Sequence, residues 1–317
     1  MTQNNSGGAG RLRGYHSELF ALADAPFSLL RELIMEKTGM YFDDAKRGLL
    51  ADKLSELVAV NGLTSFLDYY YLLRHDENAD AHLNALMNRL SVPETYFWRQ
   101  SEQILAMSEV IAPTHFATKP RAPLRVWSAA CCTGEEPVSL AIALAEVGLL
   151  DAQPIEIVGT DGSPAMVARA RANSFGPRSF RQIPANLKER YFEPDGDRWR
   201  PIERIRRAVS YDVANLAVPA EFAGLATADV IFCRNVFIYF ADDVIRRVAR
   251  TFCERMPDDG CVFLGAAESL TRLNVDLELA EIGKAFAYVK AGRRHHIERT
   301  NSAILATRTA THVTTGH

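Results

Sequence analysis

The segment from Val126 to Pro137 constrains the fold of this chain more than any other part of the sequence. It reads Val-Trp-Ser-Ala-Ala-Cys-Cys-Thr-Gly-Glu-Glu-Pro, which predicts a buried strand, a tight turn of small residues and a helix start. Proline suits the first helical position because the amide that it lacks would be unpaired there, and residues 138–150 continue as an apolar helix. A strand that passes through such a turn into a helix is typical of nucleotide-binding α/β domains.

The composition of the turn narrows the kind of nucleotide. It contains a single glycine, Gly134, and no G-x-G-x-x-G fingerprint, so the backbone cannot approach a pyrophosphate as it does in dehydrogenases. Glu135 and Glu136 stand at the positive end of the helix, where they would repel a phosphate and favour a cation. S-adenosylmethionine is a nucleoside with a positive sulfonium and no phosphate, and it therefore suits this turn better than a dinucleotide does.

A second predicted strand supplies an acceptor for a ribose. Residues 155–160 read Ile-Glu-Ile-Val-Gly-Thr and end in Asp161, at about the separation at which nucleotide folds place a ribose-binding carboxylate. We therefore expect Asp161 to accept hydrogen bonds from the ribose diol. The alternative is that Glu135, Glu136 and Asp161 only cap helices, since acidic residues favour first helical turns.

Length and composition set the outer limits. A chain of 317 residues is long enough for about two domains, and its net charge of −3 argues against wholesale binding of nucleic acid or of an anionic membrane. Neither a signal peptide nor an apolar run of membrane-spanning length is evident, so a cytoplasmic location is expected. We expect no metal site: the five cysteines show no zinc spacing and are predicted to be reduced, and His295, His296 and His317 are too sparse.

The regions before the turn predict a helical domain. Apolar residues recur at helical spacing from Pro26 to Gly39, from Asp43 to Gly62, from Thr64 to Leu73 and from Ala79 to Leu90. The second of these helices carries three basic residues that would form either a solvated surface or a face for an acidic partner helix; they are Lys46, Arg47 and Lys53.

Residues 91–99 join the helical domain to the nucleotide domain. Tyr96, Phe97 and Trp98 stand together before Arg99, and at least part of this aromatic group must be buried. It would form either a hydrophobic plug or a wall of the cofactor pocket, with Thr95 donating a hydrogen bond and Arg99 paired with a carboxylate.

Later segments predict further strands and an insertion. A basic and aromatic stretch at about 175–210 includes alternation over 199–209 that is consistent with an inserted antiparallel ribbon, for which Asp195-Gly196 suits the turn. A buried strand at 229–233 leads into Asn235 and Val236 at the edge of the sheet where active sites of open α/β folds lie. Tyr239 would face the transferred methyl group or simply lie in the core.

Three separated motifs resemble the CheR family of chemotaxis receptor methyltransferases. They are Glu94-Thr95-Tyr96-Phe97-Trp98-Arg99, the turn described above and Cys233-Arg234-Asn235-Val236-Phe237-Ile238-Tyr239-Phe240, and the resemblance covers roughly residues 23–290. It implies that Arg99 lies beside the transferred methyl group. Our hypothesis is that Arg99 and Tyr239 are the catalytic pair, which places the two ends of the reaction. The cofactor contacts that the resemblance implies are Thr95, Arg99, Ala130, one of Glu135 and Glu136, Asp161, Asn215, Leu216, Asn235 and Val236. Pro93 departs from the pattern, because many relatives carry an asparagine there that touches the cofactor.

The resemblance also implies an organisation and an activity. We expect a Rossmann-like S-adenosylmethionine-dependent methyltransferase sheet with a small inserted antiparallel β-subdomain, preceded by an all-α domain. The expected parts are a disordered tail (1–17), the helical domain (18–92), a linker and connecting helix (93–123), the methyltransferase domain (124–290) and a flexible tail (291–317).

The expected reaction is methylation of glutamate side chains in the cytoplasmic helical region of chemoreceptors, by a monomer, giving methyl esters and S-adenosylhomocysteine. Glutamate has a pKa of about 4.3, so the acceptor is already ionised and no general base is required. A receptor tail peptide at the β-subdomain is left open. The alternatives are a diverged member acting on another protein or a small molecule, and a non-catalytic adaptor.

Overall fold

A computed structural model describes residues 22–300 of the chain. The tail 1–17, for which disorder was expected, lies outside the described residues, and so do residues 301–317, including His317. The chain divides into two compact units with the boundary between Val92 and Pro93, and each unit is described by itself.

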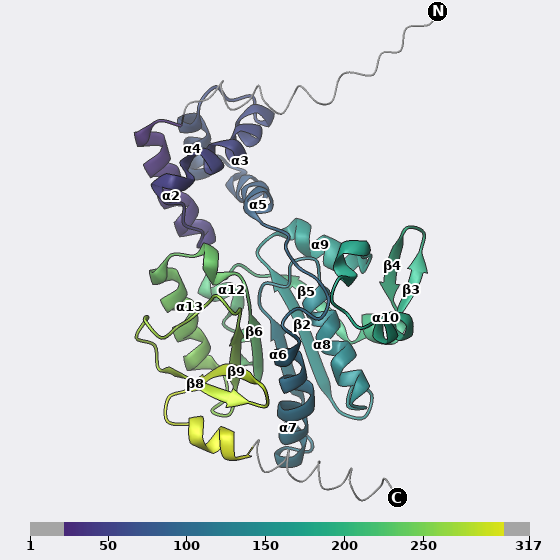
Figure 1. Cartoon of the computed structure of the whole chain (residues 1–317). Coiled ribbons are helices and arrows are strands. Elements are labelled where there is room, and N and C mark those ends of the chain that lie inside the picture. Colours follow the sequence, from purple (N-terminus) through teal and green to yellow (C-terminus); the bar gives the residue numbers. More distant parts are fainter. Residues whose placement is uncertain (1–21, 301–317) are drawn as a thin grey trace, which may run out of the picture. The chain divides into compact units, whose positions relative to one another are not determined.

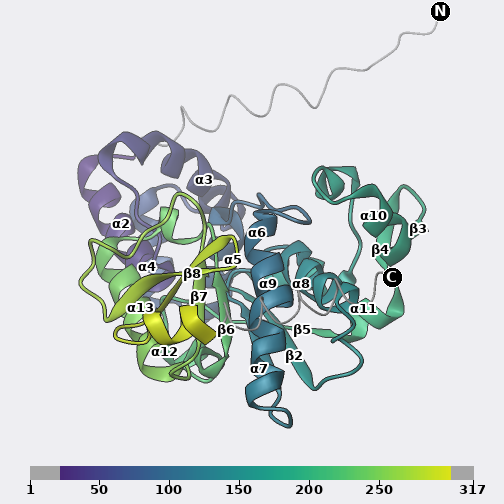
Figure 2. The ribbon, with the colours of Figure 1, turned by 60° about the horizontal axis from the view of Figure 1, so that its bottom comes forward.

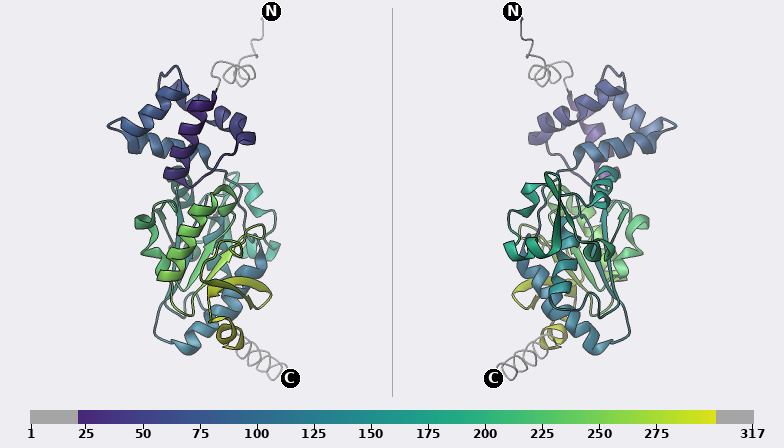
Figure 3. Two further views of the ribbon diagram at one scale, coloured as in Figure 1. Left: turned by 90° about the vertical axis from the view of Figure 1, so that its left-hand side faces the viewer. Right: turned by 90° about the vertical axis from the view of Figure 1, so that its right-hand side faces the viewer.

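The first unit is a bundle of helices, which Figure 3 shows from two sides. Its first helix ends at Gly39, whose left-handed backbone (φ 76°) lets its N–H reach back to the Met35 carbonyl. Ser65 caps the third helix by accepting a hydrogen bond from the Asp68 amide. The predicted helices are therefore confirmed, with the second opening in a 3₁₀ turn. The elements are α2 (Asp24–Thr38), η1 (Asp44–Lys46), α3 (Arg47–Val60), α4 (Phe66–His75) and α5 (Ala79–Leu90).

The basic residues of the second predicted helix make contacts inside this unit. Lys53 donates to the carbonyl oxygens of Arg89 and Leu90 at the end of α5, and burial, with the charge of Arg89, lowers its pKa. Arg47 pairs with Asp24 at 2.6 Å, and Lys46 lies 3.7 Å from Asp43. These side chains therefore stabilise the helical unit itself.

The second unit is built on a seven-stranded mixed sheet with the order β5-β2-β1-β6-β7-β9-β8 (Figure 1). The first five strands of this order are parallel, and β9 and β8 add an antiparallel edge. From β1 the strand order runs one way through β2 to β5 and the other way through β6 to β7. The order therefore reverses between β1 and β6, and open α/β sheets bind ligands at such a point. The strands are β1 (Leu124–Ser128), β2 (Ile155–Asp161), β5 (Val209–Val213), β6 (Val230–Cys233), β7 (Cys261–Leu264), β8 (Leu277–Ile282) and β9 (Ala285–Lys290).

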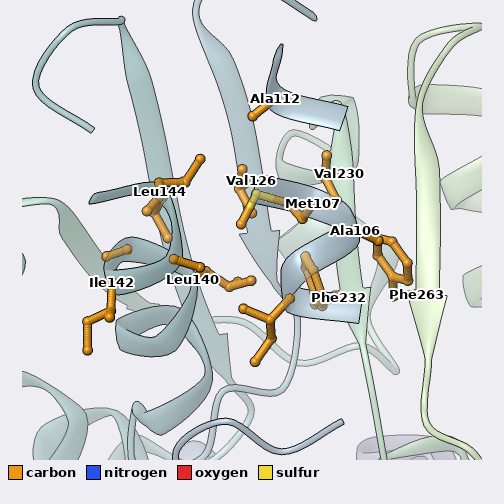
Figure 4. Close-up of a cluster of buried hydrophobic side chains, with 14 of the residues drawn as sticks. Ala106, Met107, Ala112, Val126, Leu140, Ile142, Leu144, Val230, Phe232 and Phe263 are labelled. Atoms are coloured by element: carbon orange, nitrogen blue, oxygen red, sulfur yellow. The ribbon is translucent and has the colours of Figure 1, made fainter. Parts of the chain in front are cut away.

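Side chains of alternating strand positions build a core on each face of the sheet. On one face Val126, Phe232 and Phe263 pack against Leu140 of α8 and Met107, as Figure 4 shows. On the other face the Trp127 ring lies 6.0 Å from Phe222 and 5.6 Å from Phe252, and its indole N–H donates to the Thr160 hydroxyl. Both faces of β1 are thus buried, as its apolar sequence predicts.

Helical segments cover both faces. α8 packs against β1, β2 and β5, whereas η4 and α13 pack on the face that carries Trp127. The helical segments of this unit are α6 (Ser101–Leu105), the π-helical η2 (Ala106–Ile111), α7 (Ala112–Thr118), α8 (Glu135–Glu146), α9 (Pro164–Ala172), η3 (Pro177–Phe180), α10 (Ala185–Tyr191), α11 (Glu203–Arg207), α12 (Pro219–Phe222), η4 (Leu225–Thr227), η5 (Phe237–Tyr239) and α13 (Asp242–Arg255).

The insertion contains the expected antiparallel ribbon, but earlier in the chain than predicted. β3 (Phe192–Asp195) pairs with β4 (Arg198–Pro201) about a turn in which Gly196 has φ 64° (Figure 2). The alternation over 199–209 was misleading, because Glu203–Arg207 is helical and Val209 begins a strand of the main sheet.

Two further boundaries differ from the sequence-based expectations. Helix α8 begins at Glu135 rather than at Pro137, because Gly134 (φ 96°) already turns the chain into the helix. Residues 294–300 are helical, with Ile297 buried, although a flexible tail was expected from 291. Burial of Ile297 in the sheet's main core explains the order of that segment.

Candidate active site

Strained backbone gathers around the carboxyl ends of the parallel strands. Four non-glycine residues there have positive φ: Trp98 (66°), Gln100 (54°), Cys132 (51°) and Asn235 (60°). This conformation is uncommon outside glycine, and for a bulky residue such as tryptophan it is costly. Strain of this kind persists where the surrounding structure fixes it, and it concentrates at functional sites.

The turn after β1 is held from below by Tyr211 of β5. A side-chain carbon added to Gly134 would lie 2.9 Å from the Tyr211 hydroxyl oxygen and 3.1 Å from the Ala170 Cβ. Burial raises the pKa of the Tyr211 hydroxyl, which therefore remains protonated. Only glycine satisfies both the positive φ and the close approach at this position.

We expect Gly134→Ala to lower the free energy of unfolding by about 2–4 kcal/mol, from backbone strain together with overpacking against Tyr211. Gly148→Ala is a matched control, since Gly148 also has positive φ (74°) but no atom within 4 Å of the added carbon. Its cost should be about 1 kcal/mol. Urea unfolding of both variants measures the difference, and equal losses would show that the contact with Tyr211 is unimportant.

The two glutamates of the turn have different surroundings. Glu135 is buried and accepts hydrogen bonds from the Thr133 hydroxyl at 2.6 Å and from the Ser179 hydroxyl at 2.8 Å. Glu136 accepts from the Ser128 hydroxyl at 2.6 Å and lies 3.2 Å from Nε of Arg234. Burial raises the pKa of Glu136, although Arg234 opposes the shift.

The Asp161 carboxylate stabilises the same turn by binding a backbone amide of the turn. It accepts from the amide of Cys132 at 3.0 Å and from the amide of Ser163 at 2.9 Å. Burial raises its pKa, and these two hydrogen bonds oppose the rise. Because each carboxylate oxygen has two acceptor sites, the group retains capacity for a diol.

The segment before α6 is tied to both α8 and the insertion. The Phe97 amide donates to the Ser179 carbonyl, and the Phe97 ring lies within about 5.0 Å of the rings of Phe175, Phe180 and Phe192. This explains the aromatic group as a buried anchor of the insertion.

The polar side chains of this segment lie outside that anchor. Arg99 donates to the Glu94 carbonyl at 2.7 Å, and the ring of Tyr96 carries the guanidinium of Arg181 at 3.7 Å and that of Arg99 at 5.5 Å. Thr95 is half-buried, whereas Pro93 is exposed.

The loop after β6 is shaped by Glu268. This carboxylate accepts from the amides of Asn235 (2.7 Å), Phe237 (2.7 Å) and Ile238 (3.3 Å), and from Gly265 in its own loop (2.6 Å). The loops after β6 and β7 are thereby joined at one anion.

The loop carries Tyr239, and burial raises the pKa of its hydroxyl while the charge of Arg99 opposes this rise. Arg99 lies at the same edge of the sheet, because its main-chain carbonyl accepts a hydrogen bond from Arg234, which follows β6.

Asn215 and Leu216, which the resemblance implies as cofactor contacts, follow β5. The side-chain oxygen of Asn215 accepts from the Ala217 backbone amide at 2.9 Å. The backbone N–H of Asn215 donates to the Glu221 carboxylate at 2.8 Å. Leu216 is buried. The geometry is that of an Asx turn.

The sequence analysis missed several residues of the site. Arg234 was named only as part of a motif, and Ser139, Ser179, Tyr211 and Glu268 were given no role. Their signal is tertiary: each acts through a backbone or buried partner far away in the chain, so no local spacing reveals it. Among residues 22–300 no cluster of His, Cys, Asp and Glu could hold a metal ion, and no helix is long and apolar enough to span a bilayer.

All five cysteines are free thiols, as expected. Cys131, Cys233 and Cys261 are buried, and burial raises the pKa of the Cys132 thiol to about 12. Adjacent Cys131 and Cys132 are therefore poor nucleophiles in this turn.

The mixed seven-stranded sheet and the match of residues 93–286 to a SAM-binding methyltransferase domain define an S-adenosylmethionine-dependent methyltransferase. That match is to the CheR methyltransferase SAM binding domain, and residues 25–91 match the CheR all-alpha domain. The chain belongs to the CheR methyltransferase family.

Relatives in this family have related but not identical names. The chain is 31% identical over 282 residues to chemotaxis protein methyltransferase 2 of Vibrio cholerae, with 88% of this chain and 98% of that protein covered. It is 28% identical over 260 residues to the chemotaxis protein methyltransferase of Escherichia coli, covering 81% and 88%. It is also 31% identical over 257 residues to the probable biofilm formation methyltransferase WspC of Pseudomonas putida, covering 81% of this chain and 60% of that protein.

Proposed function

We propose that this chain methylates glutamate side chains in the cytoplasmic helical region of chemoreceptors, giving γ-carboxyl methyl esters. This choice is supported by relatives that are named chemotaxis methyltransferases and that match this chain along most of their length. The observation that carries it is a sheet edge with arginine, tyrosine and buried carboxylates, in a family whose members bind S-adenosylmethionine.

The donor set fits this cofactor. An anionic turn suits a sulfonium and an amine, Asp161 suits a ribose diol, and a guanidinium suits a carboxylate. We propose that Thr95, Arg99, Ala130, Glu136, Asp161, Asn215, Leu216, Asn235 and Val236 hold it. Glu136 is the better of the two glutamates for this role, since 15% of its side chain is exposed, whereas Glu135 is buried.

The reaction requires little acid–base work from the protein. S-adenosylmethionine, when bound, supplies the electrophilic methyl group, which passes to a carboxylate that is already ionised. Arg99 and Tyr239 would orient the acceptor and the methyl end along one line, and the buried turn would exclude water. The methyl–sulfur bond breaks as the oxygen–methyl bond forms, and the products are a neutral ester and S-adenosylhomocysteine.

The test uses purified protein, adenosylmethionine with a radiolabelled methyl group and membranes that contain chemoreceptors. Label in the receptor band that alkali releases as methanol is the expected result, because esters hydrolyse and amides or methylamines do not. Membranes without chemoreceptors are the control. Cofactor binding without any alkali-labile label would contradict the proposal and favour another acceptor or an adaptor role.

We also propose that the protein acts in the cytoplasm as a monomer. A second set of membranes, carrying a receptor that controls biofilm formation in place of a chemoreceptor, addresses the similarity to WspC. Stronger labelling of that receptor would place this chain with the biofilm methyltransferases rather than with chemotaxis.

A further inference from the structure

Arg234 is a buried charge that the proposed reaction does not use. Only 2% of its side chain is exposed, and it lies at the carboxyl end of β6 beside Asn235. Its Nη2 donates to the main-chain carbonyl oxygen of Arg99 at 2.5 Å, and its Nε lies 3.2 Å from Glu136. Burying a guanidinium is costly unless it is paired, so a specific role has to offset that cost.

The carbonyl that Arg234 binds belongs to a strained turn. Trp98 and Gln100, on either side of Arg99, both have left-handed backbone, with φ of 66° and 54°. Two long-range hydrogen bonds hold this turn: Ser139 of α8 accepts from the Trp98 amide at 3.1 Å, and Arg234 donates to the Arg99 carbonyl. Without them the chain would relax towards ordinary backbone angles, and the Arg99 side chain would point elsewhere.

We infer that Arg234 is a positioning residue that fixes the Arg99 peptide and thereby aims the Arg99 guanidinium at the methyl end of the cofactor. The inference rests on the role proposed for Arg99. It makes one buried chain of contacts, from Ser128 through Glu136 and Arg234 to Arg99, that joins β1, α8, β6 and the segment before α6.

The contacts from Ser128 to Arg99 require an arginine at position 234. Its planar fork reaches a carboxylate with one nitrogen and a carbonyl with another, whereas lysine presents a single point charge. Nε and Nη1 of Arg234 lack a partner with hydrogen-bond geometry in the described part of the chain, so the Glu136 contact is an ion pair of imperfect alignment. The contact with the Arg99 carbonyl is therefore its one well-formed hydrogen bond among the described residues.

A double-mutant cycle tests the inference through the dissociation constant for S-adenosylhomocysteine, measured by calorimetry on the full chain. Arg99→Met and Arg234→Lys should each raise Kd about 10-fold, because each removes a charge-assisted contact or its aim. If Arg234 acts through Arg99, the double variant should be only about 10- to 20-fold weaker than the wild type rather than about 100-fold. Asp161→Asn combined with Arg234→Lys is the control pair, and their effects should multiply.

Two outcomes overturn the inference. One is multiplication of the Arg99→Met and Arg234→Lys effects, which would mean that Arg234 acts through Glu136 alone. The other is a wild-type Kd in Arg99→Met, because Arg99 would then have no cofactor contact to aim. If Arg234→Lys fails to fold, Arg234→Gln takes its place in the cycle, because it also removes the hydrogen bond to the Arg99 carbonyl and leaves Glu136 unchanged.

The cycle is independent of the methyl acceptor. It requires only the cofactor product, so a failure to label chemoreceptors leaves its result interpretable. Receptor labelling combined with fully multiplicative Kd effects would reject the role of Arg234 and leave the proposed function intact.

Discussion

Replacing Arg99 with alanine is expected to lower kcat for receptor methylation by about 10²- to 10³-fold, the range seen when one preorganised charge is removed from an active site. The guanidinium is held by the Glu94 carbonyl, and its charge opposes the rise in the pKa of the Tyr239 hydroxyl. Arg99→Lys should recover little of the loss, because the planar fork is replaced by a point charge. Initial rates at saturating adenosylmethionine, with receptor membranes as acceptor, measure the effect.

Arg181→Ala is the matched control for this prediction. Arg181 lies over the same Tyr96 ring and pairs with the Glu94 side chain, so its removal disturbs the same segment without touching Arg99. We expect its kcat to stay within about 5-fold of the wild type, since an exposed pair contributes little. Equal losses in Arg99→Ala and Arg181→Ala would indicate that the segment merely needs its surface charges, and the proposed role of Arg99 would fail.

The sheet could be predicted because local signals determine most of its strands. Val126 and Trp127 are both apolar, as a strand buried on two faces requires, and Gly134 marks the turn that follows. β8 was not predicted. Its exposed Leu279 and Glu281 alternate with buried Ala280 and Ile282, and β8 owes its place to pairing with β9, which no local pattern specifies.

The insertion shows where periodicity misleads. The apolar residues Ile202 and Ile205 are three positions apart, which suits a helical turn and not a strand, and the backbone amide of Ile205 donates to the Ile202 carbonyl in a short helical turn. Burial of Ile205 against the core, rather than strand propensity, determines the local structure. The hairpin turn at Gly196 was predicted because glycine supplies the positive φ directly.

The candidate site divides along the same line. Residues that stand at or after the end of a strand, such as Asp161 and Asn235, were named as site candidates from the sequence. Arg234 and Glu268 were not, because they bind backbone groups of segments far away in the chain: Arg234 the Arg99 carbonyl, and Glu268 the amides of Asn235, Phe237 and Ile238. Long-range contacts of this kind are fixed by the fold and leave no local spacing to read.

Replacing Asp161 with asparagine is expected to raise the Kd for adenosylmethionine by about 10- to 100-fold. The charged acceptor for the ribose diol would be lost, and hydrogen bonds to charged groups contribute about 1.5–3 kcal/mol each. The amide would also set an N–H against the donor of Cys132 or Ser163, which now bind the two carboxylate oxygens. Asp212→Asn, an exposed carboxylate on the neighbouring strand β5, is the control and should leave Kd unchanged.

The same carboxylate predicts a pH dependence of binding with a defined sign. Burial raises the pKa of Asp161, so the group gains its proton at a higher pH than an exposed aspartate does. If the ionised form binds the diol, affinity is complete above that raised pKa and falls as the pH decreases through it. As the pH falls, the Kd of the wild type should therefore rise more steeply than the Kd of Asp161→Asn. The pH dependence that remains in Asp161→Asn reports Glu136, because burial raises the pKa of that carboxyl too. Parallel pH profiles for the two proteins would show that Asp161 shapes the turn without contacting the cofactor.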